Sequence, residues 1–204
     1  MKNSLILCTT SLMVLYTCPA PARADQLTLP TVPTSIQVPA GHKVFLVGHA
    51  IGTQNYICLP AATSSGFAWT LFGPQATLFD DHGKQIITHF LSANPAEAGT
   101  PRTTWQHSKD TSAVWALAIA NAPVPDAIPL LLLRVVGAQE GTTGSDRLTD
   151  TTFIHRLNTV AGVAPATGCA LSSNVGARAL IPYTADYFFY REKDRGRHGD
   201  DDDD

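Results

Sequence analysis

The feature that most constrains the fold of this chain is the density of residues that break regular structure. The sequence contains 15 glycines and 14 prolines in 204 residues, and they separate short apolar segments along most of its length. Proline removes a backbone donor and glycine loses much conformational entropy on folding, so long helices tolerate such breaks badly. The pattern therefore predicts a compact, turn-rich β domain.

The segments between the breaks have the length and composition of β-strands. Aliphatic, aromatic and β-branched residues dominate them, and Gly, Pro, Asn and Asp dominate the turns. We expect a hairpin turn at 51–53 and a loop over 92–101. The predicted fold is all-β and single-domain, a sandwich or a closed barrel of about nine strands. The expected strands span residues 43–50, 54–59, 67–72, 76–79, 84–91, 113–121, 128–136, 151–157 and 180–190.

Two runs, 113–121 and 128–136, are the most apolar parts of the chain. Prolines and polar residues between and within them, such as Asn121 and Pro129, prevent an unbroken stretch of the roughly 18 residues that a membrane helix requires. Each run is expected to be a strand that is buried on both faces. A helix over 112–121 remains an alternative, because alanine is frequent there.

The N-terminal segment has the pattern of a secretory signal peptide. Lys2 precedes a mostly apolar stretch, and a small-x-small sequence ends at Ala24. We predict a signal peptide over 1–24, cleaved after Ala24, and hence a secreted or periplasmic protein with no transmembrane segment; lipidation at Cys18 is the alternative. The rest of the chain is expected to divide into an extended arm over 25–42, a β domain over 43–190 and a disordered, charged tail over 191–204.

Cleavage leaves two cysteines, Cys58 and Cys169. An even pair in an oxidising compartment predicts one disulfide, and two buried free thiols are the alternative. The two positions are 111 residues apart. A loop of that size stabilises a fold by about 4.7 kcal/mol in the chain-entropy model.

The charge balance excludes one class of partner. The chain has 14 basic and 17 acidic residues, which is not the composition of a nucleic-acid-binding protein. The tail over 191–204 holds four of the basic and seven of the acidic residues. It is expected to be solubilising, with weak binding of calcium or a cationic surface as the alternative.

Several clusters resemble a known family of exported bacterial and fungal domains. They are QNYIC at 54–58, PQATL at 74–78, IHRLNT at 154–159 and PYTADYFFY at 182–190. On these residues the chain resembles domain-of-unknown-function family 3455 over about residues 34–190. The resemblance implies export and a single domain, and it brings no established reaction, cofactor or catalytic residue. Two departures are the expansion over 93–103 and the absence of a glycine from Asp110-Thr111-Ser112.

Four side chains are candidates for ligand binding. Trp105 is expected in a loop, where binding residues concentrate, and His89 lies at the other end of the same expanded segment. Arg156 and Asp186 are charges inside apolar strands, and such charges are rarely buried without a partner. A structural ion pair between them is the first interpretation, and polar anchors in a ligand pocket are the second.

A metal site is a further hypothesis, because the chain has seven histidines. No His-x-His, His-Glu-x-x-His or Cys-x-x-Cys motif occurs, so a transition metal would need a site assembled across strands. The candidate ligands are His89, His107 and Asp110. The sequence also lacks a Gly-x-Ser-x-Gly nucleophile motif and a glycine-rich phosphate loop.

Two classes of function follow from these candidates. The first is an exported, non-enzymatic β domain that binds a small molecule, a glycan or an envelope or extracellular protein near residues 92–110. The second is a metal-dependent or hydrolytic enzyme that uses cross-strand His and Asp residues; a structural or surface-layer role is the remaining alternative. No cofactor is evident from the sequence.

Overall fold

A computed structural model describes residues 29–62, 65–142 and 146–193. The regular structure of these residues is eight β-strands and three short 3-10 helices, which span Thr34–Ile36, Pro95–Glu97 and Ser172–Asn174. The all-β prediction is confirmed. The predicted signal peptide and nearly all of the predicted tail lie outside the described residues.

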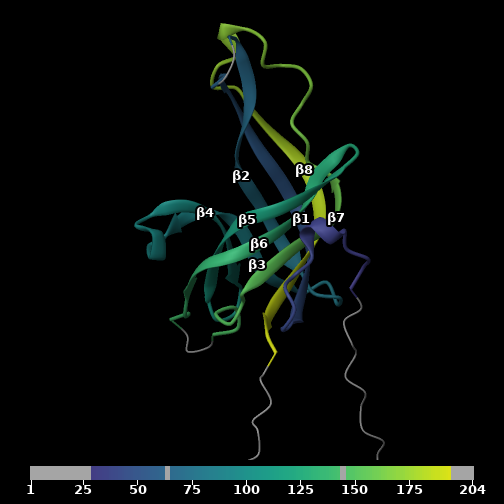
Figure 1. Cartoon of the computed structure of the whole chain (residues 1–204). Helices are drawn as coiled ribbons and strands as arrows, with labels where there is room; N and C mark the ends of the chain where they lie inside the picture. The colour runs from purple at the N-terminus through teal and green to yellow at the C-terminus, as the bar shows by residue number, and fades with distance from the viewer. Residues whose placement is uncertain (1–28, 63–64, 143–145, 194–204) are drawn as a thin grey trace, which may run out of the picture.

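The strands form one closed barrel in which each strand pairs with the next along the chain and β8 pairs with β1 (Figure 1). All of these pairs are antiparallel. Of the two predicted architectures, the sandwich and the barrel, the structure has the barrel. The strands are β1 (His42–Pro60), β2 (Phe67–Phe79), β3 (Gln85–Asn94), β4 (Thr100–His107), β5 (Ala113–Val124), β6 (Ala127–Gln139), β7 (Phe153–Ala161) and β8 (Arg178–Glu192).

The prediction of a turn at 51–53 was wrong, because β1 runs through this segment without a break. Gly52 pairs with Ala76 of β2. A Cβ atom on Gly52 would lie 2.2 Å from the backbone oxygen of Gln75 and 2.5 Å from the Cα atom of Ala76. The glycine is therefore needed for the close approach of two strands rather than for a turn.

The predicted end of a strand at Gly73-Pro74 was also wrong, because β2 continues through it. Leu71 pairs with Tyr56 and Gly73 pairs with Asn55, so that Phe72 is the extra residue of a β-bulge. Gly73 has a φ of 145°, which favours glycine at this position. The bulge bends β2 where it leaves the barrel wall.

Strand β4 lies where the sequence predicted mostly loop. Its residues are polar and contain no run of aliphatic side chains, yet all eight of its positions opposite β3 are paired. The alternative helix over 112–121 is not formed, because that segment belongs to β5. About nine strands were expected and eight are observed. The two predicted breaks that are absent merge four expected strands into two, and β4 adds one.

Two clusters of buried side chains stabilise the barrel, one inside it and one outside. The inner cluster lies inside the barrel and takes residues from every strand, among them Leu78, Ile87, Trp105, Val114, Ile154 and Phe189. The outer cluster packs the N-terminal arm against β5, β6, β7 and β8, and its Ile36 is fully buried. His155 fixes the arm, since its Nε2 atom lies 2.6 Å from the carbonyl oxygen of Ile36.

Strands β1, β2 and β8 extend beyond their other neighbours at one end of the barrel (Figure 1). The predicted disulfide joins Cys58 of β1 to Cys169 in the connection between β7 and β8, with the Cα atoms 5.5 Å apart. Backbone hydrogen bonds from Cys58 to Ala177 and from Gly176 to Cys58, each 2.9 Å long, hold the same connection. The disulfide therefore ties the long connection to the extension.

Candidate ligand-binding cavity

The barrel holds a cavity of about 440 Å³ that opens at the end from which the extension projects. All eight strands contribute to its wall. Most of the wall is apolar, and at its edge Leu71, Leu91 and Leu117 are exposed. The volume lies within the range of about 300–1,000 Å³ that is typical of small-molecule sites. The polar side chains in the wall include Gln54, Tyr56, His89, Arg156 and Tyr187.

His89 and Trp105 form one side of the cavity. They are direct partners on β3 and β4, and their rings stack with centroids 4.2 Å apart and planes 15° from parallel. The Nδ1 atom of His89 lies 2.9 Å from the carbonyl oxygen of Thr104 and donates to it, which leaves Nε2 as an acceptor. Burial lowers the pKa of His89 to about 3, so its imidazole is neutral at ordinary pH.

Arg156 is a further basic side chain that lines the cavity. It lies on β7 between Leu131 of β6 and Tyr187 of β8. Its Nε and Nη2 atoms both donate to the carbonyl oxygen of Pro129, at 3.1 and 2.9 Å. Arg156 forms no ion pair with a carboxylate of the described residues. A half-buried guanidinium thus faces an apolar cavity without a counter-charge.

Two buried donors in the wall have no hydrogen-bond partner among the described residues. They are Nε2 of Gln54 and Nε1 of Trp105. Gln54 is 2% exposed and Trp105 is 1% exposed, so neither donor is satisfied by bulk water. An unpaired buried donor costs about 1–3 kcal/mol, and native proteins retain few of them. Both residues line the cavity.

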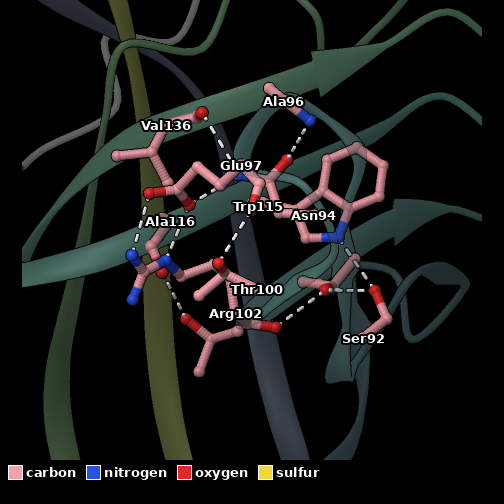
Figure 2. Close-up of polar contacts among 11 residues, drawn as sticks. Ser92, Asn94, Ala96, Glu97, Thr100, Arg102, Trp115, Ala116 and Val136 are labelled. Atoms are coloured by element: carbon pink, nitrogen blue, oxygen red, sulfur yellow. Dashed lines mark hydrogen bonds and ion pairs between the residues drawn. The ribbon is translucent and has the colours of Figure 1, made fainter.

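The hairpin between β3 and β4 supports one edge of the cavity through a polar network (Figure 2). Glu97 accepts hydrogen bonds from Nε and Nη2 of Arg102, at 2.7 and 2.8 Å, and from Nδ2 of Asn94, at 2.8 Å. The hydrogen bonds from Arg102, followed by the one from Asn94, lower the pKa of Glu97 to about 2. Asn94 also donates to the carbonyl oxygen of Val136 and so ties the hairpin to β6. Arg102 at the edge is thereby paired, in contrast to Arg156.

The three predicted metal ligands do not come together. His107 is the last residue of β4 and Asp110 lies in the turn that follows, with Nδ1 of His107 3.0 Å from Oδ1 of Asp110, whereas His89 lies in the cavity wall. Burial would raise the pKa of Asp110, but hydrogen bonds from Arg147 and Ser112 outweigh it and hold that pKa at about 2. The described residues contain no group of three or more His, Cys, Asp or Glu side chains suited to a metal ion.

The predicted ion pair between Arg156 and Asp186 is not formed. Asp186 pairs with Leu157, one position from Arg156, and neighbouring residues of a strand point to opposite faces. Asp186 therefore lies on the outer surface, where its Oδ1 atom is 2.6 Å from Nδ1 of His49. Asp81 lies 2.8 Å from the other ring nitrogen of His49. Hydrogen bonds to Asp81 and then to Asp186 raise the pKa of His49.

Three of the four predicted ligand-binding residues thus line the cavity, and Asp186 does not. Trp105 reaches the cavity from a buried strand position and not from a loop. Gln54 and Tyr187 also line it and were not predicted. Gln54 was missed because a turn was predicted just before it. Tyr187 was missed because nothing in the sequence distinguished it from the other aromatic residues of its strand. The signal for Gln54 was a long amide side chain in phase with Ala50 and Gly52 on one face of β1.

Comparisons with known proteins give a family but no activity. The family described as "Protein of unknown function (DUF3455)" matches residues 39–191, which is most of the chain. No curated protein and no solved structure matches the chain. Within the described residues, no helix has the length and hydropathy needed to cross a membrane. The match covers every strand of the barrel almost to its last residue, and the chain therefore belongs to the DUF3455 family.

Proposed function

We propose that the chain is a binding protein that takes a small, mostly apolar molecule into the open end of its barrel. The observation that carries this proposal is the pair of buried, unpartnered donors, Gln54 Nε2 and Trp105 Nε1, in the wall of an apolar cavity. A ligand that accepts from either donor would supply the hydrogen bond that the described residues do not. The apolar remainder of the ligand would cover the leucines of the wall.

The composition of the wall favours binding over catalysis. The residues that line it include no carboxylate, cysteine or serine, so they offer neither a carboxylate pair nor a serine or cysteine nucleophile. His89 is neutral and stacked on Trp105, and its Nδ1 atom is engaged by a backbone carbonyl. These groups can position and select a ligand.

We propose further that the protein works outside the cytoplasm. The disulfide between Cys58 and Cys169 supports this, because such bonds persist in oxidising compartments. The signal-like pattern before Ala24 supports it as well. Mass spectrometry of the protein from its own cells tests the proposal, since a mature chain that begins at Asp25 is expected. A chain that retains Met1 in the cytoplasmic fraction would refute it.

The binding proposal is tested with N-phenyl-1-naphthylamine, a neutral apolar probe that fluoresces in apolar surroundings. Saturable fluorescence with a stoichiometry near one probe per chain is expected. Ala116→Phe places a large side chain against the cavity, because Ala116 is 2% exposed and lines it. This variant is expected to lose most of the signal.

Ala68→Phe is the matched control, because Ala68 is an exposed position on β2 that does not line the cavity. It is expected to bind the probe like the unaltered protein. Circular dichroism confirms that both variants keep the β fold. Probe binding that is absent from the unaltered protein, or that Ala116→Phe leaves unchanged, contradicts the proposal.

A further inference from the structure

We propose that the ligand carries a single carboxylate, which Arg156 binds inside the barrel while the apolar body of the ligand fills the space along the leucine side chains. This inference rests on the proposed binding function and specifies its ligand class. Arg156 brings a positive charge into an apolar wall, and it forms no ion pair with a carboxylate of the described residues.

The geometry of Arg156 suits an anion that enters from the cavity. Nε and Nη2 of Arg156 donate to the carbonyl oxygen of Pro129, at 3.1 and 2.9 Å, and the neighbouring hydroxyl of Tyr187 is a further hydrogen-bond partner. These bonds fix the plane of the guanidinium and leave N–H groups for a ligand. A planar carboxylate matches a guanidinium in two parallel hydrogen bonds, which gives both affinity and orientation.

The neighbouring polar groups add donors and no competing charge. Gln54 Nε2 and Trp105 Nε1 are unpartnered donors, and each is buried. His89 is neutral at ordinary pH, because burial lowers its pKa to about 3. The residues that line the cavity include no Asp or Glu that would repel an anion. Its second arginine, Arg102, is already paired with Glu97 in the hairpin network of Figure 2.

The balance of these charges selects the kind of anion. One unpaired guanidinium is neutralised by one monoanion, whereas a dianionic phosphate would leave an uncompensated charge in apolar surroundings. The apolar wall, which includes Ile128, Leu131 and Leu133, requires a hydrocarbon or aromatic body. An apolar monocarboxylate satisfies both conditions.

Titration calorimetry with paired probes tests the inference. The probes are decanoate and 2-naphthoate, each beside its primary amide, which has nearly the same shape without the charge. We expect at least one of the two carboxylates to bind about 10- to 100-fold more tightly than its amide, the usual range for a hydrogen-bonded charge in a protected site. Arg156→Met is expected to reduce that ratio to near one.

Arg134→Met is the matched control, because Arg134 is an exposed arginine on β6, the neighbouring strand. It is expected to leave the ratio unchanged. If Arg156→Met does not fold, the ratio in the unaltered protein still decides the question, and decyl sulfate provides a second comparison. Tighter binding of decyl sulfate than of decanoate would overturn the choice of a carboxylate.

The failure of this inference can be distinguished from failure of the binding function. If N-phenyl-1-naphthylamine binds but no carboxylate binds more tightly than its amide, the carboxylate inference is wrong and the cavity proposal stands. A preference for carboxylates that persists in Arg156→Met would also overturn the role of Arg156. If neither the neutral probe nor any carboxylate binds, both proposals fail.

Discussion

The buried imidazole of His89 makes the free energy of unfolding depend on pH in a way that one substitution can isolate. His89 is 2% exposed, and burial lowers its pKa from 6.5 to about 3. Between these values the unfolded chain binds a proton at this position and the folded chain does not. The stability that His89 contributes is therefore fully present above about pH 6.5 and is lost as the pH falls towards 3.

The expected size of the effect follows from the two pKa values. At pH 4 the pH is about 2.5 units below the pKa of the imidazole in the unfolded chain and still above its pKa in the folded chain. Protonation therefore stabilises the unfolded state relative to the folded state by about 3 kcal/mol. This is a large part of the roughly 5–15 kcal/mol by which a domain is stable. His89→Gln removes the titrating group and keeps a donor that can reach the carbonyl oxygen of Thr104.

The assay is urea unfolding followed by fluorescence, at several pH values between 7.5 and 4, with the disulfide intact. The difference in unfolding free energy between the unaltered protein and His89→Gln is expected to change by about 3 kcal/mol across this range. Contributions of the other histidines are common to both proteins and cancel. His82→Gln, at an exposed position in the β2–β3 turn, is the control and is expected to show no such change. Parallel curves for the unaltered protein and His89→Gln would refute the reasoning.

Three other predictions concern the disulfide, the β1–β2 contact and the outer histidine. Replacing Cys58 and Cys169 together by serine is expected to lower the unfolding free energy in urea by about 5 kcal/mol, because the bond closes a loop of 111 residues; a loss below about 1 kcal/mol would show that the loop is already restricted without it. Gly52→Ala is expected to cost about 3 kcal/mol in the same assay, because the new methyl group meets backbone atoms of β2, and an unchanged midpoint would contradict that contact. Asp81→Asn is expected to lower the pKa of His49 in an NMR titration, since the hydrogen bond to Asp81 is the largest cause of its rise, and a pKa that does not move would assign the rise to other groups.

The sequence predicted the strand-rich fold and the disulfide because both depend on local composition and on residue type. It misplaced the strand ends where a glycine had two possible roles. Gly52 and Gly73 are both compatible with turns, and only the partner strand shows that one permits close packing and the other a bulge. Strand β4 was overlooked because its neighbours, and not its own apolar residues, determine its pairing.

The candidate site was predictable in its residue types and not in its geometry. His89, Trp105 and Arg156 stood out as unusual residues in their segments, and all three line the cavity. Their grouping depends on register, which sequence does not reveal: a shift of one position between β7 and β8 would place Asp186 rather than Tyr187 beside Arg156. The same shift would neutralise the charge on which the proposed ligand class depends.

The pairing of β1 with β8 has a consequence for how the chain reaches its native state. His42 pairs with Glu192, so the barrel closes only when β1, the first strand of the chain, pairs with β8, the last. Pairing between such distant segments is slow, and until it occurs one edge of the 19-residue β1 stays open to other chains. Both cysteines precede β8, so oxidation can fix the β1 extension to the β7–β8 connection while the seam is still open. We therefore expect the yield of refolded protein to depend on whether oxidation precedes closure of the barrel, and not only on the stability of the finished barrel.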